Sequence, residues 1–419
     1  MNTVIQLAWA TLERVFPRVA SAVVIVAFAA FTDPGAVGVY SWVALTYTLY
    51  QAVAESALRN QAVVSVSNPR HVRSVRRTAH SSALLGSFAI LVVLVGLWFT
   101  NGQDLGGYIL GLVPFLVVPF ITTAGIVPVA RLQYLQEWHK LARYQLLAAV
   151  AGLSLSFVVV WLTRSSVAMA VHLLATESTF LFLVHRAHAR VDITPQEGGR
   201  HPRKGMRSLV TLSALGWGQG QLERVFVGGF AGVGNLGTYS TAVTMGRSPG
   251  EALSSATSNF LRARISAEKD TAKHPALIRR ITLLAVLATT AAVGVVLALV
   301  EWVLDPILGD AWNVTLAAVP TLAVATIPYS ISLALQIMAI YYERPRASIV
   351  PAVMALACAP LIGWVALESI EAAAYVVVGK ELLVLLVTYA LSRIKGAALP
   401  VMVAVSCTAI ALPVVNVLM

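Results

Sequence analysis

Apolar stretches of about 20 residues, separated by short polar gaps, follow one another along the whole chain. A membrane-spanning α-helix needs about 20 mostly apolar residues, and thirteen stretches approach or exceed this length. Their approximate ranges are 12–32, 38–66, 80–99, 108–130, 143–163, 167–185, 209–230, 237–260, 281–304, 314–340, 348–367, 372–392 and 398–418. The pattern predicts an all-α polytopic membrane protein with about 12–13 transmembrane helices and no soluble domain.

Positive charges lie almost entirely in every second gap between these segments. Of the 30 Lys and Arg residues, 22 fall in even-numbered gaps, one falls in an odd-numbered gap, and seven fall inside segments. Because cytoplasmic loops are rich in Lys and Arg, we expect the even gaps and the N-terminus to be cytoplasmic. The net charge of +11 is therefore a topology signal and not a nucleic-acid footprint.

The first segment is expected to be a retained helix. Glu13 and Arg14 interrupt its start, and no small-residue cleavage site follows a short apolar core. Arg outnumbers Lys 24 to 6, and Ala and Val are abundant, which suggests a GC-rich bacterial source. The predicted location is the bacterial cytoplasmic membrane.

The longest polar gap divides the chain into two halves. It contains Pro195, Gly198 and Gly199, which are typical of a linker. The predicted organisation is an N-terminal six-helix bundle (1–190), a cytoplasmic linker (191–208), a C-terminal six-helix bundle (209–396) and an extra C-terminal membrane segment (397–419).

The two halves also contain similar turns. Residues 31–41 resemble residues 230–240 at a constant offset of 199, with Phe, Gly, Tyr and Ser matching in register. Six helices per half give both halves the same orientation, so we expect a parallel pseudo-two-fold repeat, as in several transporters.

Ionisable residues interrupt several segments at helical spacing. Gln51, Glu55 and Arg59 recur on one face of the second segment. The eighth segment carries a longer polar stripe: Ser240, Thr244, Arg247, Ser248, Glu251, Ser255, Ser258, Asn259 and Arg262. Because charges in hydrocarbon cost several kcal/mol, such groups face a protein interior or a water-filled cavity.

Arginines from the second, seventh and eighth segments indicate a cavity between the halves that receives an anion. Arg suits phosphate, since it stays charged and presents a planar fork of donors. The alternative for Glu55 with Arg59, Glu223 with Arg224, Arg247 with Glu251, and Lys380 with Glu381 is structural ion pairing.

Small and helix-breaking residues are typical of a bundle that moves. Gly216 and Gly220 form a small-xxx-small pair that allows close helix approach. Pro114, Pro119 and Pro128 in the fourth segment, and Pro320 and Pro328 in the tenth, predict bends or hinges, with static kinks as the alternative.

Motifs for enzyme chemistry are missing from the sequence. It contains no G-x-x-x-x-G-K-[ST] and no H-E-x-x-H. Cys358 and Cys407 lie in apolar segments and form no disulfide framework or metal spacing. The outer gaps are too short to carry an extracellular active site, so we expect no enzyme and no cofactor.

Three local features resemble the Wzx-type polysaccharide flippases of the multidrug/oligosaccharidyl-lipid/polysaccharide exporter superfamily. They are the turn Gly38-Val39-Tyr40, the run Gln221-Leu222-Glu223-Arg224-Val225-Phe226, and residues 230–239 leading into a polar eighth segment. The chain departs from this family in two respects: the family usually has twelve or fourteen helices, and its seventh-helix signature usually has Asp at the position of Glu223.

This resemblance implies a MATE-like fold and the flipping of a polyprenyl-diphosphate-linked oligosaccharide by alternating access, for cell-surface polysaccharide biosynthesis. The implied partners are this lipid-linked glycan, membrane lipids and polysaccharide-assembly machinery, and no nucleic acid. Without a nucleotide site, an H⁺ or Na⁺ gradient would drive any uphill step, with Glu251 or Glu223 as proton carrier.

For this substrate, we expect three arginines to bind diphosphate, three glutamates to tune them, and four polar residues to bind sugar. They are Arg224, Arg247 and Arg59; Glu55, Glu223 and Glu251; and Gln219, Gln221, Ser248 and Asn259. The main rival function is an ion-coupled multidrug or metabolite antiporter of the same fold. A membrane-embedded glycan polymerase or acyltransferase is a second rival.

Overall fold

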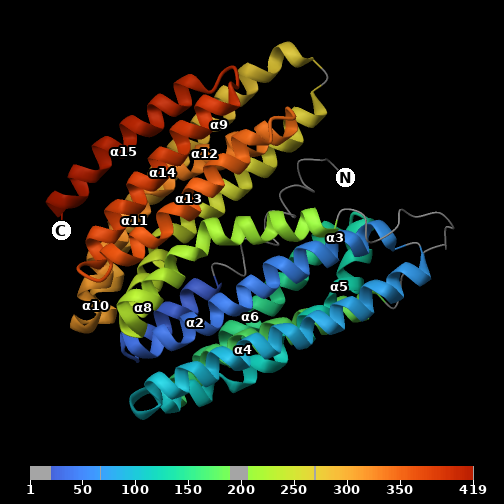
Figure 1. Ribbon diagram of the computed structural model, residues 1–419, viewed down its shortest axis with the longest axis vertical. Helices are drawn as coiled ribbons and strands as arrows, with labels where there is room; N and C mark the ends of the chain where they lie inside the picture. The colour runs from blue at the N-terminus through green and yellow to red at the C-terminus, as the bar shows by residue number, and fades with distance from the viewer. Residues whose placement is uncertain (1–19, 67, 189–205, 269, 419) are drawn as a thin grey trace. The chain divides into compact units, whose positions relative to one another are not determined.

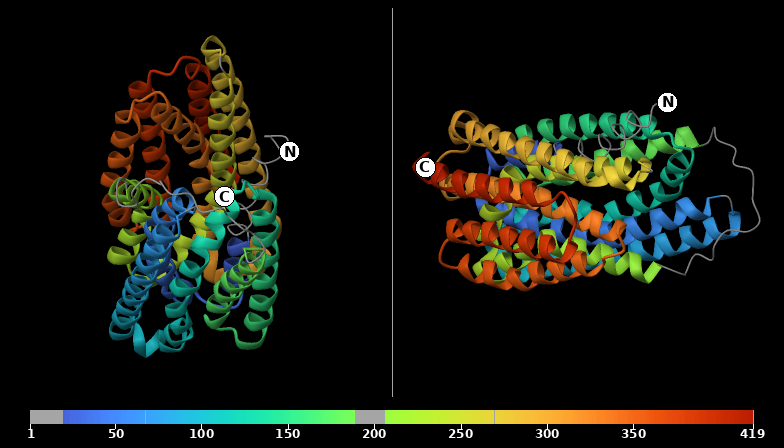
Figure 2. Two further views of the ribbon diagram at one scale, coloured as in Figure 1. Left: turned by 90° about the vertical axis from the view of Figure 1, so that its right-hand side faces the viewer. Right: turned by 90° about the horizontal axis from the view of Figure 1, so that it is seen from above.

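The computed structural model describes residues 20–66, 68–188, 206–268 and 270–418, and all regular structure in these ranges is helical. The chain divides into two compact units, Met1–Gln221 and Leu222–Met419, and the boundary between them falls inside a helix. Residues 189–205, which include most of the predicted linker 191–208, lie outside the described ranges. Figures 1 and 2 show that the helices of each unit run along one another.

The first unit contains an apolar helix at Ala20–Ala29 and the helices of the second to sixth predicted segments. These are α2 (Pro34–Tyr50), the π-helical turn Gln51–Glu55, α3 (Ser56–Ser65), α4 (Pro69–Gly111), the 3₁₀ turn Val113–Val117, α5 (Val118–Tyr134), α6 (Trp138–Thr163) and α7 (Val167–His188). The 62-residue helix α8 (Met206–Ala267) begins in this unit and continues into the second.

The rest of the second unit follows the remaining predicted segments. It contains the 3₁₀ turn Thr271–Lys273, α9 (His274–Leu299), the π-helical turn Val300–Leu304, α10 (Asp305–Leu308), the 3₁₀ turn Asp310–Trp312, α11 (Asn313–Val324), α12 (Thr326–Tyr341), α13 (Arg346–Val365), α14 (Ile370–Ser392) and α15 (Ala398–Leu418). Within the unit, α14 packs against α11, α12 and α13, and α15 packs against α9 and α12.

The expectation of an all-α polytopic membrane protein is confirmed. Among the described residues, seven helices are long and apolar enough to cross a membrane, or eight if the bent pair α11 and α12 forms one span. The other predicted segments are shorter or carry the ionisable residues discussed below. The extra C-terminal segment is one of the seven, since Ala398–Val415 meets the length and hydropathy requirements.

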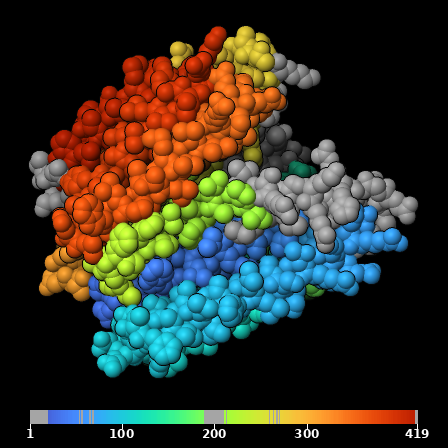
Figure 3. All heavy atoms as spheres, in the orientation of Figure 1, coloured from blue at the N-terminus to red at the C-terminus, as the bar shows by residue number. Residues whose placement is uncertain are grey.

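Large apolar side chains lie on the outside of both units. On α4, for example, Leu85 is 74% exposed and Phe99 is 84% exposed. Figure 3 shows α4 on an outer face of the first unit, in light blue and cyan. Contiguous exposed apolar surface of this kind indicates contact with lipid.

The predicted boundary between the third and fourth segments is wrong. Helix α4 runs without interruption to Gly111, beyond the predicted end at 99, because no proline interrupts the chain between Pro69 and Pro114. At its other end, Asn68 caps the helix by accepting a hydrogen bond from the Arg70 amide at 3.0 Å, and Pro69 occupies the first turn. The arginines of the second gap are therefore helical.

The tenth predicted segment bends where its prolines predict a break. α11 and α12 meet at 41° around Ala325. Pro328 has no N–H to donate to the carbonyl of Val324, so the helical hydrogen-bond ladder is interrupted there. In the fourth segment, the 3₁₀ turn Val113–Val117 comes directly before α5, close to Pro114 and Pro119.

Close helix approach occurs at a glycine pair different from the one expected. A Cβ built at Gly216 or Gly220 meets nothing within 4 Å among the described residues. A Cβ at Gly246 would lie 2.6 Å from the Val319 carbonyl oxygen of α11, and one at Gly250 would clash with Thr326 Cβ of α12. The small-xxx-small contact in this chain is therefore made by Gly246 and Gly250.

We expect Gly246→Val to destabilise the second unit by about 1–3 kcal/mol, because the added side chain has no space against α11. Gly294→Val on α9 is the matched control, since a Cβ there meets nothing within 4 Å. Thermal unfolding of both purified variants in detergent measures the difference. An equal Tm for the two variants would contradict the close packing of α8 on α11.

Candidate functional site

A cluster of ionisable side chains lies inside the apolar second unit. Three are cations and three are carboxylates, so their formal charges sum to zero. The six-charge cluster consists of Glu223, Arg224, Arg247 and Glu251 on α8 and Lys380 and Glu381 on α14.

Glycine at position 232 brings the α8 members of this cluster together. Gly232 has φ +88° and ψ 177°, which interrupts the helix. In an unbroken helix, Glu223 and Arg247 would lie about 36 Å apart at 1.5 Å per residue. In the structure their side chains are 3.1 Å apart. The turn predicted at 230–240 is therefore confirmed, and glycine suits it because other residues rarely adopt this φ.

Arg247 is the centre of the six-charge cluster. Its Nη1 donates to Glu223 Oε1 at 3.1 Å, and its Nη2 donates to Glu381 Oε1 at 3.3 Å. Its Nε lies 3.1 Å from Glu251 Oε1. The guanidinium also lies over the ring of Tyr329 on α12, with 5.6 Å between Cζ and the ring centroid. The Arg247–Glu251 pair expected from the i, i+4 spacing is thus present, as one of three ion pairs.

Lys380 completes the deepest part of the cluster. Its Nζ donates to Glu223 Oε2 at 2.7 Å and lies 3.1 Å from Glu381 Oε1. These three side chains are only 2–3% exposed. Sequence reasoning treated Lys380 and Glu381 as a local pair and left both out of the site. The available signal was a lysine in the middle of an apolar segment, but its partner Glu223 is 157 positions away.

Arg224 differs from the other two cations of the cluster. No ion pair of its guanidinium is found within the described ranges, and its buried Nε has no hydrogen-bond acceptor there. The side chain is half-buried, whereas Arg247 is fully buried. Glu251 and Glu223 are the carboxylates whose charges act most strongly on Arg224. The Glu223 carboxylate accepts hydrogen bonds from Arg247 and Lys380. Glu223 therefore affects Arg224 through its charge and not through an ion pair, in the described part of the structure.

Hydroxyl groups with no hydrogen-bond partner lie on the same part of α8. Ser240 and Ser258 are buried, and their hydroxyl oxygens have no hydrogen-bond partner in the described part of the chain. Buried polar atoms normally form hydrogen bonds, so a buried hydroxyl without a partner in the protein indicates a place where a polar ligand or water can bind. Part of the predicted polar stripe is therefore enclosed within the second unit.

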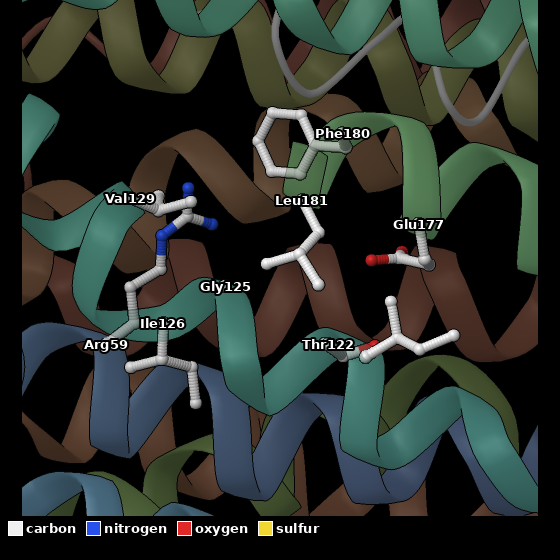
Figure 4. Close-up of a pocket in the computed structure, with 9 residues that line it drawn as sticks. Arg59, Thr122, Gly125, Ile126, Val129, Glu177, Phe180 and Leu181 are labelled. Carbon is white, nitrogen blue, oxygen red and sulfur yellow. The ribbon is translucent and has the colours of Figure 1, made fainter. Parts of the chain in front are cut away.

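Arg59 lies in the first unit, in a small pocket among α3, α5 and α7 (Figure 4). The Arg59 guanidinium and the Glu177 carboxylate point into this pocket from opposite sides, with Leu181 between them. The pocket has room for about one or two water molecules. The Gln133 amide, oriented with its oxygen toward Arg59, accepts from Nη2 at 3.1 Å and from Nε at 3.2 Å.

The other predicted site residues are more scattered. Gln219 and Gln221 are half-buried and belong to the first unit, and Ser248 is half-buried in the second. The side chains of Glu55 and Asn259 lie outside the described part of the structure. Among the described residues, no group of three or more His, Cys, Asp or Glu side chains is arranged to hold a metal ion.

Comparison with protein families gives one match. A family model described as "Polysaccharide biosynthesis protein" matches residues 27–317, which is more than half of the chain. No curated protein sequence matches significantly.

Three solved structures illustrate the likeness in fold. The lipid II flippase MurJ in an inward closed conformation has a TM-score of 0.69 at 10% identity, covering 97% of this chain and 91% of its own. An inward-facing multidrug resistance MATE family transporter of the MOP superfamily has a TM-score of 0.63 at 15% identity, covering 93% and 98%. A MOP superfamily transporter from Pyrococcus furiosus has a TM-score of 0.56 at 16% identity, covering 94% of each. At these identities the likeness concerns the fold, and it confirms the expected MATE-like architecture.

Proposed function

Since the chain belongs to the polysaccharide biosynthesis protein family, we propose that it flips a polyprenyl-diphosphate-linked oligosaccharide across the bacterial cytoplasmic membrane. In this proposal the two halves alternate access to the two sides, and the exported glycan serves cell-surface polysaccharide biosynthesis. The protein then acts as a transporter and not as an enzyme. The likeness in fold to the lipid II flippase MurJ supports a lipid-linked substrate.

The observation that carries the proposal is the half-buried guanidinium of Arg224. Its Nε is a buried donor without an acceptor in the described structure, and it belongs to a group that stays charged in an apolar environment. Leaving such a donor unsatisfied costs free energy unless a ligand or water accepts its hydrogen bond. A diphosphate has several strong acceptor oxygens and the opposite charge, so it meets this need.

The remaining polar residues have proposed roles around the diphosphate. Gln219, Gln221 and Ser248 would hydrogen-bond sugar hydroxyls, since each is half-buried and offers donors and acceptors. Arg59 would be a second cation for the substrate, in the first unit. Glu251, the most exposed carboxylate of the six-charge cluster at 31%, is the group we propose for coupling to an H⁺ or Na⁺ gradient.

The direct test is a translocation assay. The full-length protein is reconstituted in liposomes, and movement of a fluorescent polyprenyl-diphosphate glycan between leaflets is followed by quenching with a membrane-impermeant reductant. We expect protein-dependent flipping, with the glycan-free polyprenol unmoved. Export of a lipophilic cationic dye without any glycan movement would instead favour the multidrug antiporter and overturn the proposal.

The orientation of the protein in the membrane is also part of the proposal. On α4, Ser74 among the arginines and Gln103 near the other end are both exposed, and 29 residues of helix separate them by about 44 Å. This distance is close to the full thickness of a bilayer, about 40–45 Å. The positive-inside rule then places Ser74 in the cytoplasm and Gln103 outside.

We therefore expect single cysteines to be labelled from opposite sides. With Cys358 and Cys407 replaced by alanine, Ser74→Cys should react with an impermeant maleimide in inside-out vesicles only. Gln103→Cys should react in right-side-out vesicles only. The reverse pattern would overturn the proposed orientation.

A further inference from the structure

Glu251 differs from the other two carboxylates around Arg247 in its exposure and in the absence of a hydrogen bond among the described residues. Glu223 and Glu381 each accept a hydrogen bond from Arg247 and are 2–3% exposed, whereas Glu251 is 31% exposed. Although Glu251 Oε1 lies 3.1 Å from Arg247 Nε, this N–H makes no hydrogen bond within the described structure. Of the three carboxylates, Glu251 is therefore the one that can turn toward solvent without breaking a hydrogen bond to Arg247.

Glu251 also influences the one arginine of the cluster without an ion pair in the described residues. It is the carboxylate with the strongest electrostatic effect on Arg224. The two guanidinium groups each have a buried Nε–H without an acceptor in the described ranges. Glu251 therefore supplies the charge, but not the hydrogen bonds, that an anion between Arg224 and Arg247 would supply.

The net charge of the six-charge cluster depends on the position of Glu251, and this charge determines how strongly the cluster attracts an anion. With Glu251 in place, the six-charge cluster is neutral, and an incoming anion meets no net attraction. With Glu251 turned away, Arg224, Arg247 and Lys380 face only Glu223 and Glu381, and the remaining charge is +1. A group of net charge +1 in a low-dielectric interior attracts an anion strongly.

From this geometry we propose that Glu251 is an internal counter-ion that the substrate's diphosphate displaces. Displacement makes the Nε–H of Arg247 available as a donor, and the guanidinium groups of Arg247 and Arg224 together hold the diphosphate. When the substrate leaves, the Glu251 carboxylate returns and restores neutrality. This inference rests on the proposed function and deepens it, because it assigns Glu251 to competition with the substrate and not to contact with it.

The distinguishing prediction is a gain of affinity. Glu251→Gln keeps the size of the side chain but removes the competing charge, so the purified full-length variant should bind farnesyl diphosphate about three- to tenfold more tightly. Inorganic pyrophosphate should show the same gain, because the gain comes from charge, whereas uncharged farnesol should show none. Binding is measured by microscale thermophoresis in an uncharged detergent.

Controls separate this effect from general changes in charge or stability. Glu301→Gln removes an exposed carboxylate elsewhere in the second unit and should bind like the wild type. The Tm of Glu251→Gln should fall by less than that of Arg247→Ala, because Arg247 keeps its two hydrogen-bonded carboxylates. Equal or weaker binding by Glu251→Gln, with normal binding by the wild type, would overturn this inference alone. If the wild-type protein binds neither diphosphate, both the inference and the proposed function fail.

Discussion

Replacing Arg247 by alanine should strongly destabilise the second unit. The variant leaves Glu223 and Glu381, both 2–3% exposed, with Lys380 as their one remaining ion-pair partner in the described structure. Removing one partner of a buried ion pair costs about 3–5 kcal/mol, because the other charge stays buried. We expect Tm in detergent to fall by about 10 °C or more.

Two further variants test the cause of this loss. Arg247→Lys keeps the positive charge but lacks the planar fork that reaches Glu223 and Glu381 together, so it should recover only part of the Tm. Arg262→Ala removes an exposed arginine from the same helix and should leave Tm unchanged. A wild-type Tm for Arg247→Ala would show that the cluster does not stabilise the fold.

The second large effect is expected for Arg224→Ala, and it should appear in transport and not in stability. No carboxylate loses an ion pair in this variant, since none of the described acidic residues is paired with Arg224. Charge-assisted hydrogen bonds are worth about 1.5–3 kcal/mol, so loss of the phosphate contacts should slow flipping by about 10- to 100-fold. The liposome assay with a polyprenyl-diphosphate glycan measures this rate.

Arg224→Lys is the matched variant for charge, and we expect an intermediate rate from it because lysine presents a point charge and not a fork. Insertion and Tm should equal those of the wild type in both variants. Full flipping activity in Arg224→Ala would remove this residue from the proposed site. Loss of activity together with loss of Tm would instead assign Arg224 a structural role.

These two arginines lie in the same cluster but have different expected roles. Sequence reasoning placed Arg224 and Arg247 together as diphosphate ligands, because both interrupt apolar helices. In the structure, Arg247 is already engaged by three carboxylates, whereas Arg224 has no ion pair in the described ranges. The ion-pair partners in the structure therefore distinguish Arg224, the proposed diphosphate ligand, from Arg247, the centre of the cluster.

The alternation of apolar segments and polar gaps by itself determined the all-helical membrane fold. Every predicted segment coincides with a described helix, at least in part, because about 20 apolar residues in lipid have to satisfy their backbone hydrogen bonds internally. The bend at Ala325 and the turn at Gly232 were also visible in the sequence, since proline and glycine act through the local backbone.

Only the tertiary structure decided which charges meet. Glu223 and Lys380 are 157 positions apart, and a spacing rule within one helix predicts contacts only three or four positions away. The same limit explains why, among the described residues, the close helix contact is made by Gly246 and Gly250 and not by Gly216 and Gly220. Local sequence determines where a helix begins, bends and ends, whereas pairing across helices depends on how their faces are turned toward one another in the folded unit.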